Sequence, residues 1–172
     1  MLKAKMAEAL NSQITKEAYS SYLYLSMAGY FENLTLPGMA KWMRVQSMEE
    51  SCHALIIFNY VCEQGSTPVL GPIKAPPRAF KSVEEAFAAV VEHERAVTAS
   101  IHALMDLALD LRDHATKQFL EWFVKEQVEE EASAAAMLQQ VQRVKEGQAL
   151  FVLDKDAGAR VFALPAPLTG KI

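Results

Sequence analysis

Four long stretches of this sequence carry apolar residues at helical spacing, and each stretch has a glutamate inside its apolar column. In steps of seven residues, the columns are Leu10, Glu17, Tyr24 and Phe31; Met43, Glu50 and Ile57; Phe87, Glu94, Ile101 and Ala108; and Phe123, Glu130, Met137 and Val144. A column with this repeat forms the face by which a helix packs against a core. The sequence therefore predicts four helices that each direct one carboxylate toward the interior.

The positions of the few helix-breaking residues indicate where these helices begin and end. The 172 residues include 7 glycines and 7 prolines, and six of the prolines lie within 68–77 and 165–167. Ser82 and Glu85 have the spacing of a capping box, which favours a helix start at this point. The expected elements are a bundle over about 3–146 with helices at about 3–31, 37–63, 83–111 and 114–146, a stop at Gly147, a short fifth helix at 148–158 and an irregular tail at 159–172.

The segment between the second and third helices is long and rich in glycine and proline. Residues 65–82 cannot continue a helix, and when extended they reach about 60 Å. A 27-residue helix is only about 40 Å long. The segment can therefore cross the full length of a bundle, which makes the second and third helices parallel. We expect an all-α fold, a four-helix bundle with one long crossover, in a single domain over 1–172.

Depth along the helices is a second test of the glutamate pattern. Glu17 lies about 18 residues before the first turn and Glu50 about 15 after it, and Glu94 and Glu130 each lie about 18 residues from the second turn. These levels agree within about 5 Å, so the four carboxylates are expected to meet in one layer. They cannot all stay ionised in an apolar core without counter-charge, and divalent cations would supply it.

Nitrogen and amide groups accompany two of the glutamates. His53 is one helical step from Glu50, and Gln127 lies three residues before Glu130. Mixed oxygen and nitrogen ligands suit iron, manganese or zinc better than calcium. A single Glu-x-x-His pair is usually accidental, and one glutamate on an apolar face is often a helix-edge residue. The repetition on four helices at matched depth favours a metal site.

Composition excludes several other classes of protein. The formal net charge is −4 without a basic run, so nucleic acid is not an expected partner. No apolar run is long enough for a signal peptide or a membrane span, so no membrane association is expected. Cys52 and Cys62 lie too far apart on one helix for a disulfide. Reduced thiols favour a cytoplasmic protein.

In combination, these motifs resemble the bacterial non-haem ferritins. The resemblance covers nearly the whole chain, from LNSQITKEAYSSYLYL through MRVQSMEESCHA and HERAV to FLEWFVKEQVEEE. It implies a ferritin-like bundle, ferroxidase activity toward Fe(II) with O₂, and storage of Fe(III) mineral in a homo-oligomeric cage of 24 subunits. It also implies that Glu17, Glu50 and His53 bind the first of two irons, that Glu94 and Glu130 bind the second, that Glu50 bridges them, and that Gln127 lies nearby.

The resemblance further implies groups around this di-iron centre. Tyr24 and Trp122 match aromatic residues beside it, although a buried tyrosine at a heptad position is ordinarily only core. A third iron site is implied by three glutamates that match its ligands, with Glu130 shared: Glu49, Glu126 and Glu129. The alternative for the acidic run 129–131 is a solvated face, and Glu131 is expected there.

Departures from related families limit the cofactors. Bacterioferritins have Glu-x-x-His on both the second and fourth helices, whereas here the fourth has Gln127-x-x-Glu130. They also ligate haem through a methionine at the position of Ser51, so haem is not expected. The other histidines lie off the carboxylate face and are expected to be surface or structural residues: His93, His102 and His114.

Two alternatives to storage stay open. A di-iron oxidase or peroxidase without storage would need an open pocket beside the metals, and the bulky Phe123, Met137, Ile57 and Ile101 argue against one. A metal-free helical interaction protein would use the glutamates as a hydrogen-bonded network. Iron uptake far above the capacity of the ligands would favour the ferritin.

Overall fold

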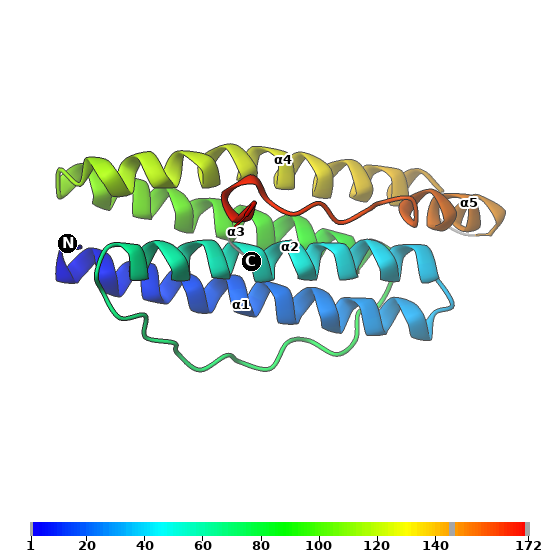
Figure 1. The fold of residues 1–172 in the computed structure, drawn as a ribbon. Coiled ribbons are helices and arrows are strands. Elements are labelled where there is room, and N and C mark those ends of the chain that lie inside the picture. Colours follow the sequence, from blue (N-terminus) through cyan, green and yellow to red (C-terminus); the bar gives the residue numbers. More distant parts are fainter. Residues whose placement is uncertain (1, 145–146, 171–172) are drawn as a thin grey trace. The chain divides into compact units, whose positions relative to one another are not determined.

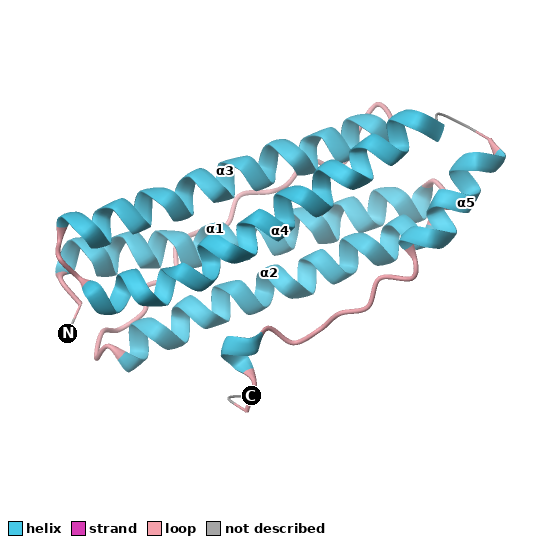
Figure 2. Cartoon of the chain, turned by 90° about the horizontal axis from the view of Figure 1, so that it is seen from above, coloured by secondary structure: helices cyan, strands magenta, loops and turns pink. Residues whose placement is uncertain are grey.

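The structure is a computed structural model, and it describes residues 2–144 and 147–170. The elements are α1 (Ala4–Asn33), α2 (Pro37–Glu63), α3 (Val83–Asp110), α4 (His114–Val144), α5 (Gln148–Ala157) and the 3-10 helix η1 (Ala166–Leu168) (Figure 1). The described residues contain no strand (Figure 2). These limits lie within two residues of those expected, except that the expected end of the fourth helix at Glu146 lies outside the described residues, and that η1 interrupts the tail expected to be irregular.

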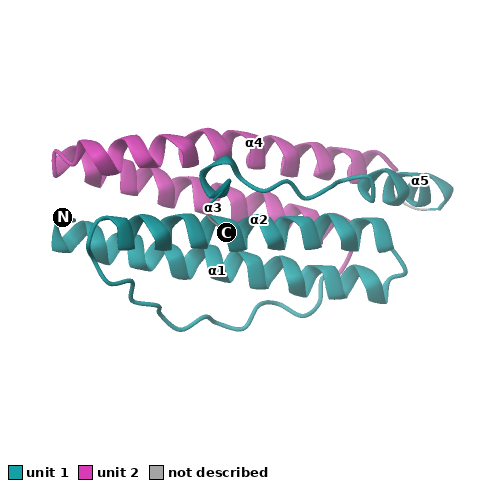
Figure 3. Cartoon of the chain, viewed as in Figure 1, with its two compact units in different colours: residues 1–80, 146–172 teal, residues 81–145 magenta. Residues whose placement is uncertain are grey.

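The chain forms two compact units (Figure 3). One unit comprises residues 1–80 and 146–172, and the other comprises residues 81–145. The first therefore contains α1, α2, the crossover and the C-terminal elements, and the second contains α3 and α4. None of the described helices is both long enough and apolar enough to cross a membrane.

In the first unit, α1 and α2 form a hairpin whose core contains the expected apolar columns. Tyr24, Phe31, Met43 and Ile57 are fully buried. The two helices are joined by a turn in which Thr35 has φ of 59°, a left-handed conformation. Burial of apolar side chains along both columns provides the main stabilisation of this hairpin.

The crossover lies along α1 (Figure 1). Near its start, Val69 N donates to Asn11 Oδ1 at 3.1 Å, and near its end Ser26 Oγ donates to Pro77 O at 2.8 Å. The segment therefore advances in the same direction as α1 and returns the chain to the end of the hairpin at which α2 begins. The expectation of a long crossover is confirmed, and its contacts show that it is attached to the hairpin along its length.

The α5 helix closes the start of α2. The Asp154 carboxylate accepts hydrogen bonds from Gly38 N at 3.1 Å and Met39 N at 2.8 Å, so it satisfies two amide groups that begin α2. A Cβ atom on Gly38 would lie 1.7 Å from the Asp154 carbonyl oxygen. Glycine at this position permits the close approach of the two backbones.

In the second unit, α3 and α4 form a hairpin with caps at both helix starts. Ser82 accepts a hydrogen bond from Glu85 N at 3.0 Å, as the capping box predicts, but the Glu85 carboxylate accepts from Lys81 N instead of from the Ser82 amide. At the start of α4, Asp113 accepts from Thr116 N at 3.0 Å and from Thr116 Oγ1 at 2.7 Å. The start of each helix is therefore fixed by local side chains.

Candidate metal centre

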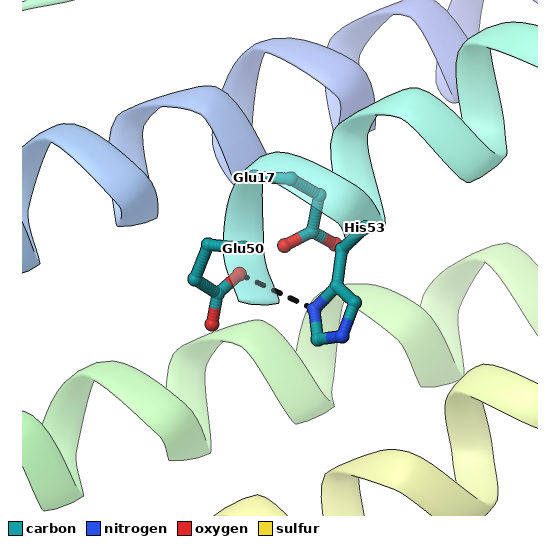
Figure 4. A group of neighbouring side chains, drawn as sticks. All are labelled: Glu17, Glu50 and His53. Carbon is teal, nitrogen blue, oxygen red and sulfur yellow. Dashed lines mark ion pairs between the residues drawn. The ribbon is translucent and has the colours of Figure 1, made fainter. Parts of the chain in front are cut away.

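Two carboxylates and an imidazole converge inside the first unit (Figure 4). Glu17 comes from α1, and Glu50 and His53 come from α2. Each residue offers one ligand atom, and these atoms lie within 4.8 Å of one another. The three side chains are no more than 1% exposed. The sequence-based expectation that these residues lie together in the core is therefore met within this unit.

Helical geometry explains this convergence. Glu50 and His53 are three residues apart, so they project from the same face of α2, and His53 Nδ1 lies 3.4 Å from Glu50 Oε2. Glu17 occupies the position between Leu10 and Tyr24 in the buried column of α1. Packing the two columns against each other places the three polar groups in one layer.

Gln13 is a contributor that the sequence analysis missed. It is 1% exposed, and its Nε2 donates to Glu17 Oε1 at 2.8 Å. The other oxygen, Glu17 Oε2, is buried and has no hydrogen-bond partner among the described residues. The signal available in the sequence was the spacing of four residues between Gln13 and Glu17. An amide at that spacing can donate to one carboxylate oxygen and leave the other oxygen for a ligand.

The charge of this cluster favours a cation. Two ionised carboxylates in a water-excluded layer repel each other, and each loses its hydration. A divalent cation would balance both negative charges and could take the His53 imidazole as a ligand. Oxygen and nitrogen donors together are typical of sites for iron, manganese and zinc.

The second unit holds three more of the predicted residues. Glu94 is 0% exposed, Gln127 is 2% exposed and Glu130 is 5% exposed. Gln127 Nε2 lies 3.4 Å from Glu94 Oε2 and 3.3 Å from Thr98 Oγ1. The structure therefore brings Glu94 and Gln127 together, and Glu130 is buried one helical step after Gln127. Thr98 was not predicted, although it follows Glu94 by one helical turn.

The aromatic residues expected around the centre, and the remaining histidines, differ in their exposure to solvent. Tyr24 is fully buried in α1, and Trp122 is half-buried with its ring centroid 4.9 Å from that of Phe123. Among the remaining histidines, His93 is half-buried, whereas His102 and His114 are exposed, as expected of surface residues.

The acidic residues assigned to a third site also differ in their exposure to solvent. On α4, Glu126 and Glu131 are half-buried and Glu129 is exposed. On α2, Glu49 is 17% exposed and forms an ion pair with Arg160 at 2.6 Å. Arg160 was not singled out from the sequence, because it lies in a tail without periodicity. The negative charge near Glu49 also affects Cys52: burial first, and then Glu49, raises the pKa of the Cys52 thiol.

Comparisons with known proteins agree on one family. The profile of the ferritin-like domain matches residues 7–144. A bacterial non-heme ferritin of Bacteroides fragilis is 39% identical over 160 residues, which cover 93% of this chain and 100% of that protein. One from Staphylococcus epidermidis is 34% identical over 163 residues, which cover 94% of this chain and 98% of that protein.

Solved structures give the same result. The chain is similar to an open pore ferritin of the archaeon Archaeoglobus fulgidus, with a TM-score of 0.92 and 46% identity over 94% of this chain and 99% of that one. It is also similar to a form of the Archaeoglobus fulgidus ferritin that was engineered to be closed, with a TM-score of 0.93 and 45% identity over 95% of this chain and 100% of that one.

Proposed function

Because this chain belongs to the ferritin family and has its four-helix bundle fold, we propose that it oxidises Fe(II) at a di-iron ferroxidase centre and stores the product as a ferric mineral. The observation that carries the proposal is the buried cluster of Glu17, Glu50 and His53. Iron is the substrate and the cargo in this scheme, and O₂ is the electron acceptor.

The proposed roles of the ligands come from the resemblance to the bacterial non-haem ferritins. Glu17 and His53 hold the first iron, and Glu50 bridges to the second, which Glu94 and Glu130 hold. Gln127 donates to Glu94, so its part is to orient that carboxylate rather than to supply charge. Gln13 does the same for Glu17. An oriented carboxylate loses less conformational freedom when iron binds.

The ligand set favours oxidation of both ions. Each Fe(II) gives one electron, and O₂ accepts the two electrons together. Anionic oxygen ligands stabilise Fe(III) more than Fe(II), which makes this transfer favourable. Two irons held side by side make the transfer a single encounter with O₂. Tyr24, buried one heptad beyond Glu17, is proposed as the aromatic group beside this centre.

The remaining parts of the proposal concern iron transfer and assembly. Glu49, Glu126 and Glu129 form a third iron site that shares Glu130. The protein assembles in the cytoplasm as a cage of 24 copies, and each subunit is a single domain. No haem is part of the proposal: at the position of the haem methionine in bacterioferritins, Ser51 forms a hydrogen bond with Ser21 at 2.8 Å.

An organic-substrate oxidase is the competing function, and three cavities of the first unit do not favour it, because none is lined by a proposed iron ligand. The most apolar cavity has a volume of about 250 Å³ and is lined by residues of α1, α2 and the crossover, including Ile14, Phe58 and Ile73. None of Glu17, Glu50 and His53 lines it. A substrate bound in this cavity would therefore not contact the three ligands.

Iron loading tests the proposal. Fe(II) is added without oxygen in increments, air is admitted, and ferric absorbance and iron per chain are measured after gel filtration. We expect many more irons per chain at saturation than the proposed ligands can hold. The iron should elute with particles of about 460 kDa, the mass of 24 chains of 19.1 kDa. Saturation at two irons per chain would favour an oxidase without storage. Absence of ferric absorbance would contradict both metal-based functions.

A further inference from the structure

The C-terminal tail brings a positive charge to one of the proposed iron ligands. Arg160 Nη2 lies 2.6 Å from Glu49 Oε2, and the two side chains are 21% and 17% exposed. The contact joins residues that are 111 positions apart in the chain. A charge-assisted hydrogen bond of this length, largely shielded from water, is stronger than an ordinary surface ion pair.

Several contacts fix Arg160 in this position. Its Cζ atom lies 4.6 Å from the centroid of the Trp42 ring, and Trp42 is only 4% exposed. Two residues earlier, the Gly158 carbonyl accepts a hydrogen bond from Lys41 Nζ at 2.8 Å. Later in the tail, Leu168 is 1% exposed. The guanidinium therefore packs on Trp42, and the tail is attached to the first unit both before and after Arg160, so the contact with Glu49 belongs to an anchored segment.

From this arrangement we infer that Arg160 is a positioning residue that weakens the hold of Glu49 on iron. The inference rests on the proposed function, in which Glu49 binds iron. The guanidinium and an iron ion compete for the negative charge of one carboxylate. If both are present, they are like charges a few ångströms apart, and their repulsion in a poorly hydrated site lowers the affinity for iron.

The guanidinium of Arg160 is part of the charge environment of Glu49 before iron binds. In the buried cluster, His53 Nδ1 lies 3.4 Å from Glu50 Oε2. Glu49 already has a cation of the protein itself. Iron at Glu49 is therefore held less tightly than it would be without Arg160, and it is released more readily to other acceptors.

Removal of the charge of Arg160 tests the inference. Arg160→Met keeps an apolar side chain over Trp42 but removes the guanidinium. The affinity of the weakest site for Fe(II) is measured without oxygen, by equilibrium dialysis of the full-length assembled protein. We expect Arg160→Met to tighten that site about tenfold, the scale expected for loss of one nearby like charge at partial burial. Arg160→Lys, which keeps the charge, should restore an affinity close to that of the wild type.

Two further variants separate this role from a purely structural one. Lys41→Met removes an attachment of the tail but leaves the Arg160–Glu49 pair, so it should lower the melting temperature without changing iron affinity. In a Glu49→Gln background, Arg160→Met should have no effect on affinity. An unchanged or weaker affinity in Arg160→Met, with iron binding by the wild type intact, would overturn the inference alone. Absence of Fe(II) binding by the wild type would overturn the proposed function and this inference with it.

Discussion

At the scale of single residues, Glu17 illustrates how a residue of a functional site can lower the stability of the folded chain. Its carboxylate is 1% exposed, one oxygen accepts a hydrogen bond from Gln13, and the other has no hydrogen-bond partner among the described residues. A buried acceptor without a partner costs on the order of 1–3 kcal/mol. Selection for stability alone would remove this cost, so the residue is best explained by a ligand that binds there.

Glu17→Gln should therefore separate stability from function. The amide keeps the size and the acceptor oxygen of the side chain, but it removes a negative charge from beside Glu50. We expect the iron-free protein to melt at the same temperature or a higher one, while initial Fe(II) oxidation falls by about tenfold or more. Differential scanning calorimetry and stopped-flow ferric absorbance measure the two effects. Glu8→Gln, at an exposed position of α1, is the matched control and should change neither.

At the scale of elements, local sequence signals predicted the helices but did not predict the contacts between residues far apart in the chain. Pro37 and Ser82 mark the starts of α2 and α3 because their effects on the backbone are local. Asp154 and Arg160 contact residues more than 110 positions earlier, and nothing in their neighbourhood identifies those partners. For the same reason, the sequence indicated Glu49 as a candidate ligand but did not predict its ion pair.

Asp154 provides a test of the contact between α5 and α2. Its carboxylate accepts the Gly38 and Met39 amide hydrogens, and it is only 5% exposed. Asp154→Ala would leave both donors unsatisfied, so we expect a loss of about 1–2 kcal/mol in the free energy of unfolding. Chemical denaturation measures it. Asp156→Ala, in the same helix but exposed, should cost less than about 0.5 kcal/mol. Equal effects of the two substitutions would contradict the capping role.

At the scale of the whole molecule, the proposed ligands are divided between the two units. The first unit supplies Glu17, Glu50 and His53, and the second supplies Glu94, Gln127 and Glu130. The family and the four-helix bundle expected from the sequence are confirmed by the comparisons. The assignment of each glutamate to an iron stays a prediction, because the sequence gives the depth of each glutamate along its own helix and not the coordination of a metal.

Iron binding at the proposed ligands predicts that iron stabilises the folded chain. A cation that binds the folded chain and not the unfolded one adds stability of about 2.7 kcal/mol at a free concentration of 100 times Kd. We expect Fe(II), added without oxygen, to raise the melting temperature of the wild type by several degrees. Glu50→Gln, which alters the proposed bridge, and Glu94→Gln, which alters the other unit, should each remove most of this increase. If only Glu50→Gln removes it, Glu94 does not hold iron, and its assignment as a ligand is wrong.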